Sequence, residues 1–452
     1  MSRTVLRLAR WTERGSGTCR SLLAASALWS VLLVSGIVPS VAWAQEQKKQ
    51  PPPEFTSGYF PPTPTEPSPR ADTFAYIDVA LLAAVLVLGT WFVFKMRSRT
   101  GVRVLVVFSA LYFGFYRMGC VCSIGSIQNV ALALGDPSYR LPVTVGAFFV
   151  LPLVFALFVG RIFCGTACPL GAIQDLVVLR PVQTHPAVDH TLGLVPYLYL
   201  GLSALLAWTG ASFLICMYDP FIPFYRMGGA WGVIAFGAAL LALGTRVGRP
   251  YCRYLCPYGV LLRWASALSR WRVRITPGEC LHCHLCADEC PFGAIHPPTP
   301  AEQAGGRQQA RKGLIRALMI TAALVPLLAA LGYAASPTIS RTHRDVRLAE
   351  RLWAEERGRV RGTTDETDAY RQLAQPFGIA YARAVEVRRR FDVGSALLGA
   401  WAGLVIGGKL ILLHVRRRRE DYEADRASCL SCARCYMSCP VEHERLGLIT
   451  LE

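Results

Sequence analysis

The sequence predicts an all-α polytopic membrane protein of about seven spans, with a small α+β module attached. Of its 452 residues, 53% are apolar, and the mean hydropathy of +0.34 exceeds that of ordinary water-soluble proteins. Apolar segments of near membrane-spanning length recur along the chain. Two cysteine runs, beginning at Cys280 and Cys429, share the spacing C-x2-C-x2-C-x3-C-P, which is typical of two-cluster ferredoxins. We therefore expect a ferredoxin-like module assembled from two separated segments.

The N-terminal region is predicted to direct the chain to a membrane. Five arginines among the first 20 residues precede an apolar run from Leu22 to about Val38, and an Ala-Trp-Ala site ends at residue 44. Residues 1–44 therefore form either a signal peptide or an uncleaved N-terminal anchor. Residues 45–72 are polar and rich in proline, which predicts an extended periplasmic linker.

Seven further spans are predicted after the linker. We expect them near residues 76–94, 104–119, 141–160, 192–215, 230–244, 314–333 and 394–413. We place residue 45 outside the membrane and let successive spans cross it in alternating directions. The arginine and lysine clusters between spans then fall on the inner side, in agreement with the positive-inside rule. One outer loop, residues 335–392, is rich in arginine, but long loops cross regardless of charge, and its stretch 348–361 is typical of a charged helix. This topology predicts a multi-pass protein of the bacterial inner membrane with a cytoplasmic C-terminus.

The spans and the cysteine runs divide the rest of the chain into four parts. They are a five-span membrane domain with two C-x3-C-P motifs (73–274), a first ferredoxin half (275–312), a helical hairpin (313–415) that includes the periplasmic loop (335–392), and a second ferredoxin half (416–452). Because two spans separate the halves, both are expected on the cytoplasmic face, where the hairpin can bring them together.

Eight cysteines of the two runs are the candidates for cofactor binding: Cys280, Cys283, Cys286, Cys290, Cys429, Cys432, Cys435 and Cys439. In bacterial two-cluster ferredoxins the fourth cysteine of each run binds the other cluster. We therefore predict two [4Fe–4S] clusters, with Cys439 joining the first run and Cys290 joining the second. Two arrangements stay open: each run holds its own cluster, or the runs pair between protomers of a dimer. Zinc, or a haem at the C-x2-C-H pattern of Cys280–His284, does not explain the repeated full spacing.

A second cysteine system lies in the membrane domain. Its members follow two predicted spans in an internal repeat, C-x3-C-P-x-G: Cys164, Cys168, Cys252 and Cys256. Because residues i and i+4 face the same side of a helix, each pair is expected to offer two thiolates from one helix end. Four such thiolates suit an iron–sulfur cluster or another thiophilic metal, and redox-active or purely structural thiols are the alternatives.

A degenerate third copy of the motif is predicted on the opposite face of the membrane. Cys120 and Cys122 begin the stretch C-x-C-S-I-G-S-I-Q, and Cys216 ends another span on the same side. These three thiols could hold a metal or exchange electrons with a periplasmic partner. Membrane-edge cysteines or an outer disulfide are the plainer alternatives.

Together, the ferredoxin runs, the paired C-x3-C-P motifs and the spans resemble the NosR/NapH-type polyferredoxin membrane proteins over about residues 74–440. The resemblance implies [4Fe–4S] binding by the eight ferredoxin cysteines, redox involvement of the C-x3-C-P cysteines, and electron supply to periplasmic reductases. NosR-like proteins carry a large periplasmic flavin domain, for which residues 45–72 are too short, so a flavin would come only through a partner. Their ferredoxin runs are usually adjacent, unlike those of this chain.

We expect a membrane-bound iron–sulfur electron-transfer component rather than a stand-alone catalyst. The expected partners are membrane lipid, a cytoplasmic donor or quinol, and a periplasmic reductase or flavoprotein; the direction of electron flow stays open. Two alternatives are a membrane copper reductase or assembly factor, since a cytochrome-oxidase assembly family shares C-x3-C-P, and a transmembrane redox sensor. The net charge of +18 is explained by loop orientation, so no nucleic-acid partner is expected.

Overall fold

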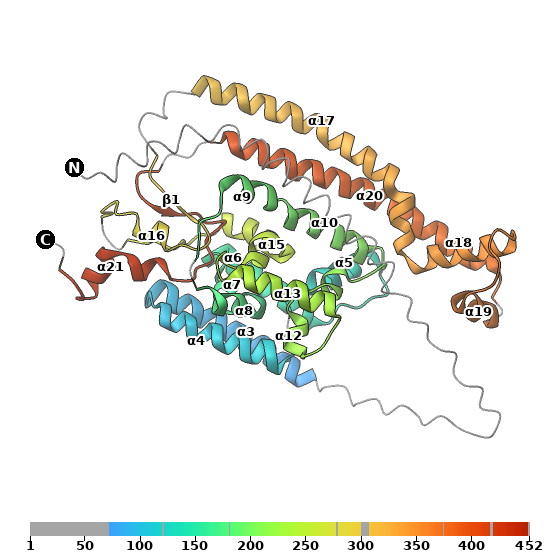
Figure 1. Cartoon of the computed structure of the whole chain (residues 1–452), viewed down its shortest axis with the longest axis horizontal. Helices are drawn as coiled ribbons and strands as arrows, with labels where there is room; N and C mark the ends of the chain where they lie inside the picture. Colours follow the sequence, from blue (N-terminus) through green and yellow to red (C-terminus); the bar gives the residue numbers. More distant parts are fainter. Residues whose placement is uncertain are drawn as a thin grey trace. The chain divides into compact units, whose positions relative to one another are not determined.

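The computed structural model describes residues 72–119, 122–179, 181–276, 279–299, 307–373, 375–415 and 419–450. The predicted signal segment, the linker up to residue 71, and Cys120 lie outside the described residues. Most of the described chain is helical, and Figure 1 shows the helices in the order of the sequence.

Helices occupy all five predicted spans of the membrane domain. They are α3 (Asp72–Thr90) with its π-helical continuation η1 (Trp91–Lys95), α4 (Arg99–Ser109) with η2 (Ala110–Tyr116), α6 (Val143–Val159), α10 (Val195–Trp208) and α13 (Trp231–Gly244). Shorter helices connect them: α5 (Ser126–Gly135), α7 (Ile162–Thr166), α8 (Pro169–Val177), α9 (Pro186–Leu192), α11 (Leu214–Met217), α12 (Ile222–Arg226), α14 (Pro250–Tyr254) and α15 (Pro257–Ala267).

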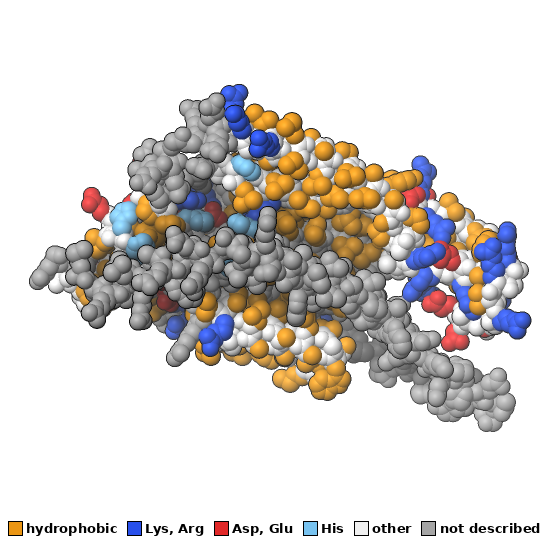
Figure 2. Space-filling view, turned by 45° about the horizontal axis from the view of Figure 1, so that its top comes forward, with side chains coloured by type: hydrophobic (Ala, Val, Ile, Leu, Met, Phe, Trp, Pro, Cys, Tyr) orange, Lys and Arg blue, Asp and Glu red, His pale blue; other side chains and the backbone are white. Residues whose placement is uncertain are grey.

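Four described helical segments are long and apolar enough to cross a membrane: Thr73–Lys95, Pro186–Trp208, Arg311–Thr342 and Phe377–His414. Two shorter apolar helices, α6 and α13, accompany them. Apolar side chains cover the outer face of the third segment (Figure 2), where Leu327 is 57% exposed and Leu331 56%. Such a face is stable in lipid and costly in water, so the chain is a membrane protein. The total of seven spans stays a prediction.

A long helical hairpin is formed by α17 (Arg307–Ile339) and α20 (Phe377–His414), which lie side by side in Figure 1. Glycines let the two backbones approach closely, because a Cβ at Gly399 would collide with the Leu328 carbonyl. The segment between them contains η4 (Ser340–Thr342), α18 (Arg344–Glu356) and α19 (Asp365–Gln372).

The hairpin helices extend far beyond the predicted spans and into the predicted loop 335–392. The apolar residues end where charged residues begin, but the helical backbone continues, and those charged residues find partners on neighbouring helices. Arg388 of α20 pairs with Glu350 of α18, and Ser336 of α17 donates to Asp392 of α20. The charged helix predicted at 348–361 is present, but it begins at Arg344 and ends at Glu356.

Two segments more than a hundred residues apart form one small α+β unit, which we call the ferredoxin-type module. Strand β1 (Ile295–His296) pairs antiparallel with β2 (Glu423–Ala424), and Ile295 lies opposite Ala424. The module also contains α16 (Leu285–Asp288), η5 (Cys435–Ser438) and α21 (Pro440–Arg445). The pairing of β1 with β2 joins the segment of the first cysteine run to that of the second.

Candidate metal-binding sites

One cavity of the ferredoxin-type module is lined by thiols from both cysteine runs. Cys280, Cys283 and Cys286 come from the first run, and Cys439 comes from the second. The buried Cys286 thiol interacts electrostatically with the other three. Four thiols that converge on one enclosed space are the donor set of a [4Fe–4S] cluster. The residues of this cavity therefore fit such a group.

A second set of thiols lies beside the first and combines three cysteines of the second run with one of the first. Cys290 of the first run interacts electrostatically with Cys432, and Cys435 interacts with Cys429, Cys432 and Cys290. Cys435 also interacts with Cys286 of the first set, so the two sets are neighbours. The structure thus exchanges the fourth cysteine between the runs within a single chain.

The two cysteine loops have the same backbone conformation around their second cysteine. His282 and His284 flank Cys283 with φ angles of 51° and 66°, and Ser431 and Ala433 flank Cys432 with 52° and 60°. Residues with a Cβ avoid this region at a cost of about 1–2 kcal/mol each. Strain repeated at equivalent positions is expected where a bound group holds the loop in place.

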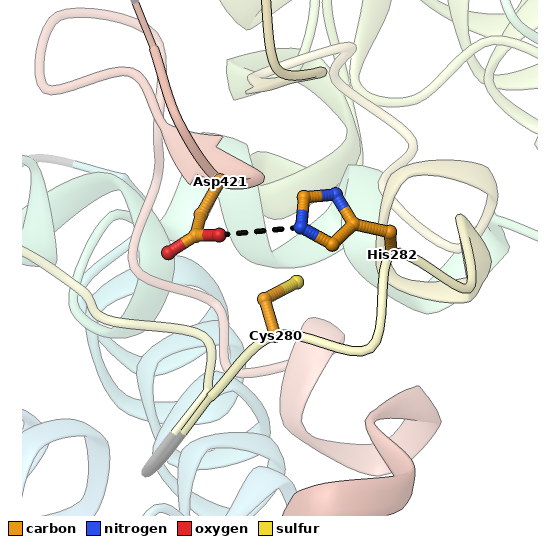
Figure 3. A group of neighbouring side chains, drawn as sticks. All are labelled: Cys280, His282 and Asp421. Atoms are coloured by element: carbon orange, nitrogen blue, oxygen red, sulfur yellow. Dashed lines mark ion pairs between the residues drawn. The ribbon is translucent and has the colours of Figure 1, made fainter.

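Histidine and aspartate flank the first cavity on its exposed side. Figure 3 shows Cys280, His282 and Asp421, whose ligand atoms all lie within 4.8 Å of one another. His282 Nε2 lies 3.4 Å from Asp421 Oδ1, and both side chains are exposed. Because Cys280 also lines the cavity, a separate metal here would compete with a cluster for that thiol.

The C-x3-C-P cysteines converge, but not in the predicted way. Cys164 lies in α7 and Cys168 precedes α8, with a break between the helices; Cys252 in α14 and Cys256 before α15 repeat this arrangement. The expectation of one helix end per pair was wrong. A proline disfavours helical geometry in the preceding residue, so Cys168 and Cys256 are extended, with ψ of 116° and 111°.

The four thiols nevertheless form one group, because Cys168 interacts electrostatically with Cys252, Cys164 and Cys256. Burial, reinforced by the neighbouring thiols, raises the pKa of Cys168 and Cys256 well above the usual value. Deprotonation of such thiols requires a compensating cation. The group, which we call the quartet, therefore fits a bound metal centre.

Two arginines each extend from one C-x3-C-P motif of the quartet to the other motif. Arg161 and Arg249 each stand three residues before the first cysteine of their motif. A Cβ at Gly171 would lie 3.1 Å from Arg249 Nη1, and a Cβ at Gly259 would lie 3.3 Å from Arg161 Nη2, so each arginine reaches the glycine of the other motif. Sequence analysis missed these residues, although both motifs share the longer pattern R-x2-C-x3-C-P-x-G.

A buried carboxylate connects the quartet with the second cysteine run. Asp175 lies 2.6 Å from Arg99 Nη2 and 3.3 Å from the Nη2 atoms of both Arg249 and Arg434. Burial opposes its ionisation, but the charges of Arg249, Arg99 and Arg434 outweigh burial and hold the pKa of Asp175 well below its usual range. Arg99 also donates to the Cys432 carbonyl at 2.8 Å. This network binds α4 and α8 to a cysteine loop of the ferredoxin-type module.

Further contacts dock the ferredoxin-type module on the membrane domain. Arg97 pairs with Glu442 at 2.8 Å and stacks on the Tyr436 ring at 4.1 Å. Arg161 donates to the Ala427 carbonyl at 3.3 Å. Arg161 interacts electrostatically with Cys429 and Cys252, and Arg249 with Cys432 and Cys252. The two arginines therefore lie between the second set of thiols and the quartet.

Cys122 and Cys216 lie together at a turn that resembles those of the quartet. Gly125 donates to Cys122 Sγ at 3.3 Å, as Gly259 does to Cys256 Sγ at 3.4 Å. A Cβ at Gly125 would lie 3.1 Å from Cys216 Sγ. These two cysteines form the outer pair, and their predicted companion Cys120 is outside the described residues.

Aromatic residues fill the space between the quartet and the outer pair. Tyr225 donates to the Pro169 carbonyl, next to Cys168, at 2.6 Å. Tyr251, next to Cys252, packs its ring on Phe221 at 5.4 Å. Tyr199 interacts electrostatically with both Cys216 and Cys256. These side chains link the two thiol groups through the membrane domain.

Comparison with known proteins gives two matches to models of a 4Fe-4S binding domain. One covers residues 141–181 and 228–276, which contain both C-x3-C-P motifs, and the other covers residues 273–296, which contain the first cysteine run. These matches support iron–sulfur clusters as the cofactors. No solved structure matches the chain.

Several curated relatives are similar over part of the chain. The regulatory protein NosR of Pseudomonas aeruginosa is 32% identical over 246 residues, which cover 48% of this chain and 33% of NosR. Protein NirI of Paracoccus denitrificans is 33% identical over 173 residues, covering 33% of this chain and 25% of NirI. The methylamine utilization ferredoxin-type protein MauN of Methylobacillus flagellatus is 29% identical over 171 residues, which cover 35% of this chain and 58% of MauN. The chain thus spans no more than a third of NosR or NirI.

The apolar helices and the 4Fe-4S matches define an iron–sulfur membrane protein. Within this class, the chain is similar to NosR and NirI over part of its length, as expected of a protein that resembles the NosR/NapH-type polyferredoxin membrane proteins. The resemblance inferred from the cysteine motifs is confirmed.

Proposed function

We propose that this protein carries electrons across the bacterial inner membrane, between a cytoplasmic or quinol donor and a periplasmic reductase or flavoprotein. The first set of thiols would bind one [4Fe–4S] cluster, through Cys280, Cys283, Cys286 and Cys439. The second set would bind another, through Cys290, Cys429, Cys432 and Cys435. When bound, such clusters supply one-electron carriers. The quartet is proposed to hold a third thiolate-ligated centre.

The observation that carries this proposal is the order in which the thiol groups neighbour one another. Cys435 interacts with Cys286 between the two ferredoxin sets, and Arg249 interacts with both Cys432 and Cys252. Tyr199 then interacts with Cys256 and Cys216. A bilayer core of about 30 Å is too thick to cross without intermediate sites, and this order supplies them.

The arginines of this series have an electrostatic role. Each reduction adds a negative charge to a site built from thiolates, and buried positive charge stabilises that added charge. Arg161 and Arg249 are 4% and 0% exposed, so water screens them little. They would favour reduction of the two centres that they separate.

Proteoliposomes with a trapped oxidant test the proposed electron flow. A membrane-impermeant reductant is added outside, and reduction of an impermeant dye inside is followed. We expect the wild type to reduce the dye and the Cys164→Ala/Cys252→Ala variant to fail, while both ferredoxin-type EPR signals persist. Absence of dye reduction by wild type, or equal rates in the two proteins, would overturn the proposal.

A further inference from the structure

A cavity of about 580 Å³ lies where the membrane domain, the hairpin helix α20 and the ferredoxin-type module meet. Cys252 of the quartet forms part of its wall, and Phe292 and Gly293, just after Cys290, form another part. This volume is in the range of sites for small organic ligands. Apart from Cys252, the lining residues of this cavity take no part in the proposed ligation of clusters.

The walls of the cavity carry a strong excess of positive charge. Among the described residues, two carboxylates line it, Asp189 and Asp288, against five cationic side chains: Arg161, Arg249, Arg253, Arg263 and Lys409. Asp189 is already engaged by Arg253 at 2.6 Å and by the hydroxyl groups of Tyr254 and Thr184. The wall therefore has little carboxylate left to neutralise its other cations.

Two of these cations have no carboxylate at ion-pair distance. Within the part of the chain that the structure describes, Arg263 of α15 and Lys409 of α20 form no ion pair and repel each other electrostatically. The attraction of Lys409 to Asp189, which already pairs with Arg253, is weaker than this repulsion. Both are only half-exposed. Two half-buried like charges facing one cavity destabilise the fold unless an anion lies between them. Nearby, Arg161 has a buried Nε without a hydrogen-bond partner.

We propose that this cavity binds a phosphate-bearing anion, with Arg263 and Lys409 as its principal contacts. Guanidinium groups bind phosphate oxygens in pairs, and an ammonium group adds a point charge, so this donor set suits phosphate. The cavity is larger than a phosphate ion, so it has room for further phosphate groups or for an organic part of the ligand. An anionic phospholipid headgroup and a free phosphate compound share this chemistry. Binding does not depend on electron transfer, so it can be tested whether or not the proposed function holds.

The test uses the full chain purified in detergent, with two arms. In the first, inorganic pyrophosphate is titrated into delipidated protein by calorimetry. In the second, native mass spectrometry detects phosphatidylglycerol retained after mild extraction. The variant R263Q/K409Q is compared with R311Q/K312Q, which removes the same two charges from the exposed start of α17.

We expect R263Q/K409Q to weaken pyrophosphate binding about tenfold or more, or to lose the retained lipid, while R311Q/K312Q matches the wild type. Binding in the first arm only identifies a free phosphate compound, and lipid loss in the second only identifies a headgroup. The charge-preserving swap R263K/K409R should retain binding, which separates loss of charge from misfolding. If wild type binds neither probe, or if R263Q/K409Q equals wild type in both arms, the proposal is wrong.

Discussion

The carbonyl oxygen of Leu430 lies where Gly165 would carry a side chain. A Cβ built on this glycine would collide with that oxygen. Gly165 lies between the first two cysteines of the quartet, and Leu430 follows Cys429 of the second run. The backbones of two proposed redox sites are therefore in direct contact, and only glycine permits this approach.

The variant Gly165→Ala should loosen this contact. Because backbone on both sides limits relaxation, we expect a loss of about 1–3 kcal/mol of stability and slower electron transfer from the ferredoxin-type module to the quartet. Thermal unfolding and stopped-flow reduction kinetics measure the two effects. Gly232→Ala is the matched control, because a Cβ at that helical glycine meets nothing within 4 Å. Equal behaviour of the two variants would show that the contact is unimportant.

Exchange of the fourth cysteine between the runs can be tested by counting iron. If Cys439 completes the first site, the double variant C280A/C439A should lose about four irons, no more than either single variant. The variant C280A/C290A should lose about eight, because it damages both sites when Cys290 belongs to the second. Met437→Ala, an exposed neighbour, serves as the control. If C280A/C439A lost both clusters and C280A/C290A only one, each run would hold its own cluster.

Much of this arrangement was accessible from sequence. The repeated cysteine spacing identified the eight ferredoxin-type cysteines, and apolar segments located seven helices, although not their lengths. The topology also placed Cys439 with the first run, and the structure lines one cavity with those four thiols. That they bind a cluster stays a proposal.

Other features could not be predicted, because they depend on contacts between distant segments. The crossing of Arg161 and Arg249 requires the two C-x3-C-P motifs to face each other, and a motif pattern does not give orientation. The cavity beside Lys409 exists only because α20 packs near α9 and α15. Pro169 and Pro257, in contrast, could have predicted from sequence the helix break between the paired cysteines.

Removal of the Asp175 charge should destabilise the protein strongly. Asp175→Asn leaves three converging arginines without their shared carboxylate, and loss of one partner from a buried ionic network costs about 3–5 kcal/mol. Chemical denaturation followed by circular dichroism measures this loss. Glu386→Gln removes an acid from an exposed pair with Arg390 and should cost less than about 0.5 kcal/mol. The double variant D175N/R434Q should recover part of the loss; a fully additive loss would contradict a shared network.

The variant Arg161→Gln should lower the midpoint potentials of the centres on either side of this residue. The reduced state carries one more negative charge, so removal of a buried cation disfavours reduction. A loss of about 1–2 kcal/mol of stabilisation corresponds to a fall of roughly 40–90 mV for a one-electron couple. Redox titration followed by EPR measures these potentials. Arg103→Gln, an exposed arginine of α4, should leave them unchanged. The first site is farther away and should shift less than the second, so an equal shift at both would show that the variant acts through general unfolding rather than local charge.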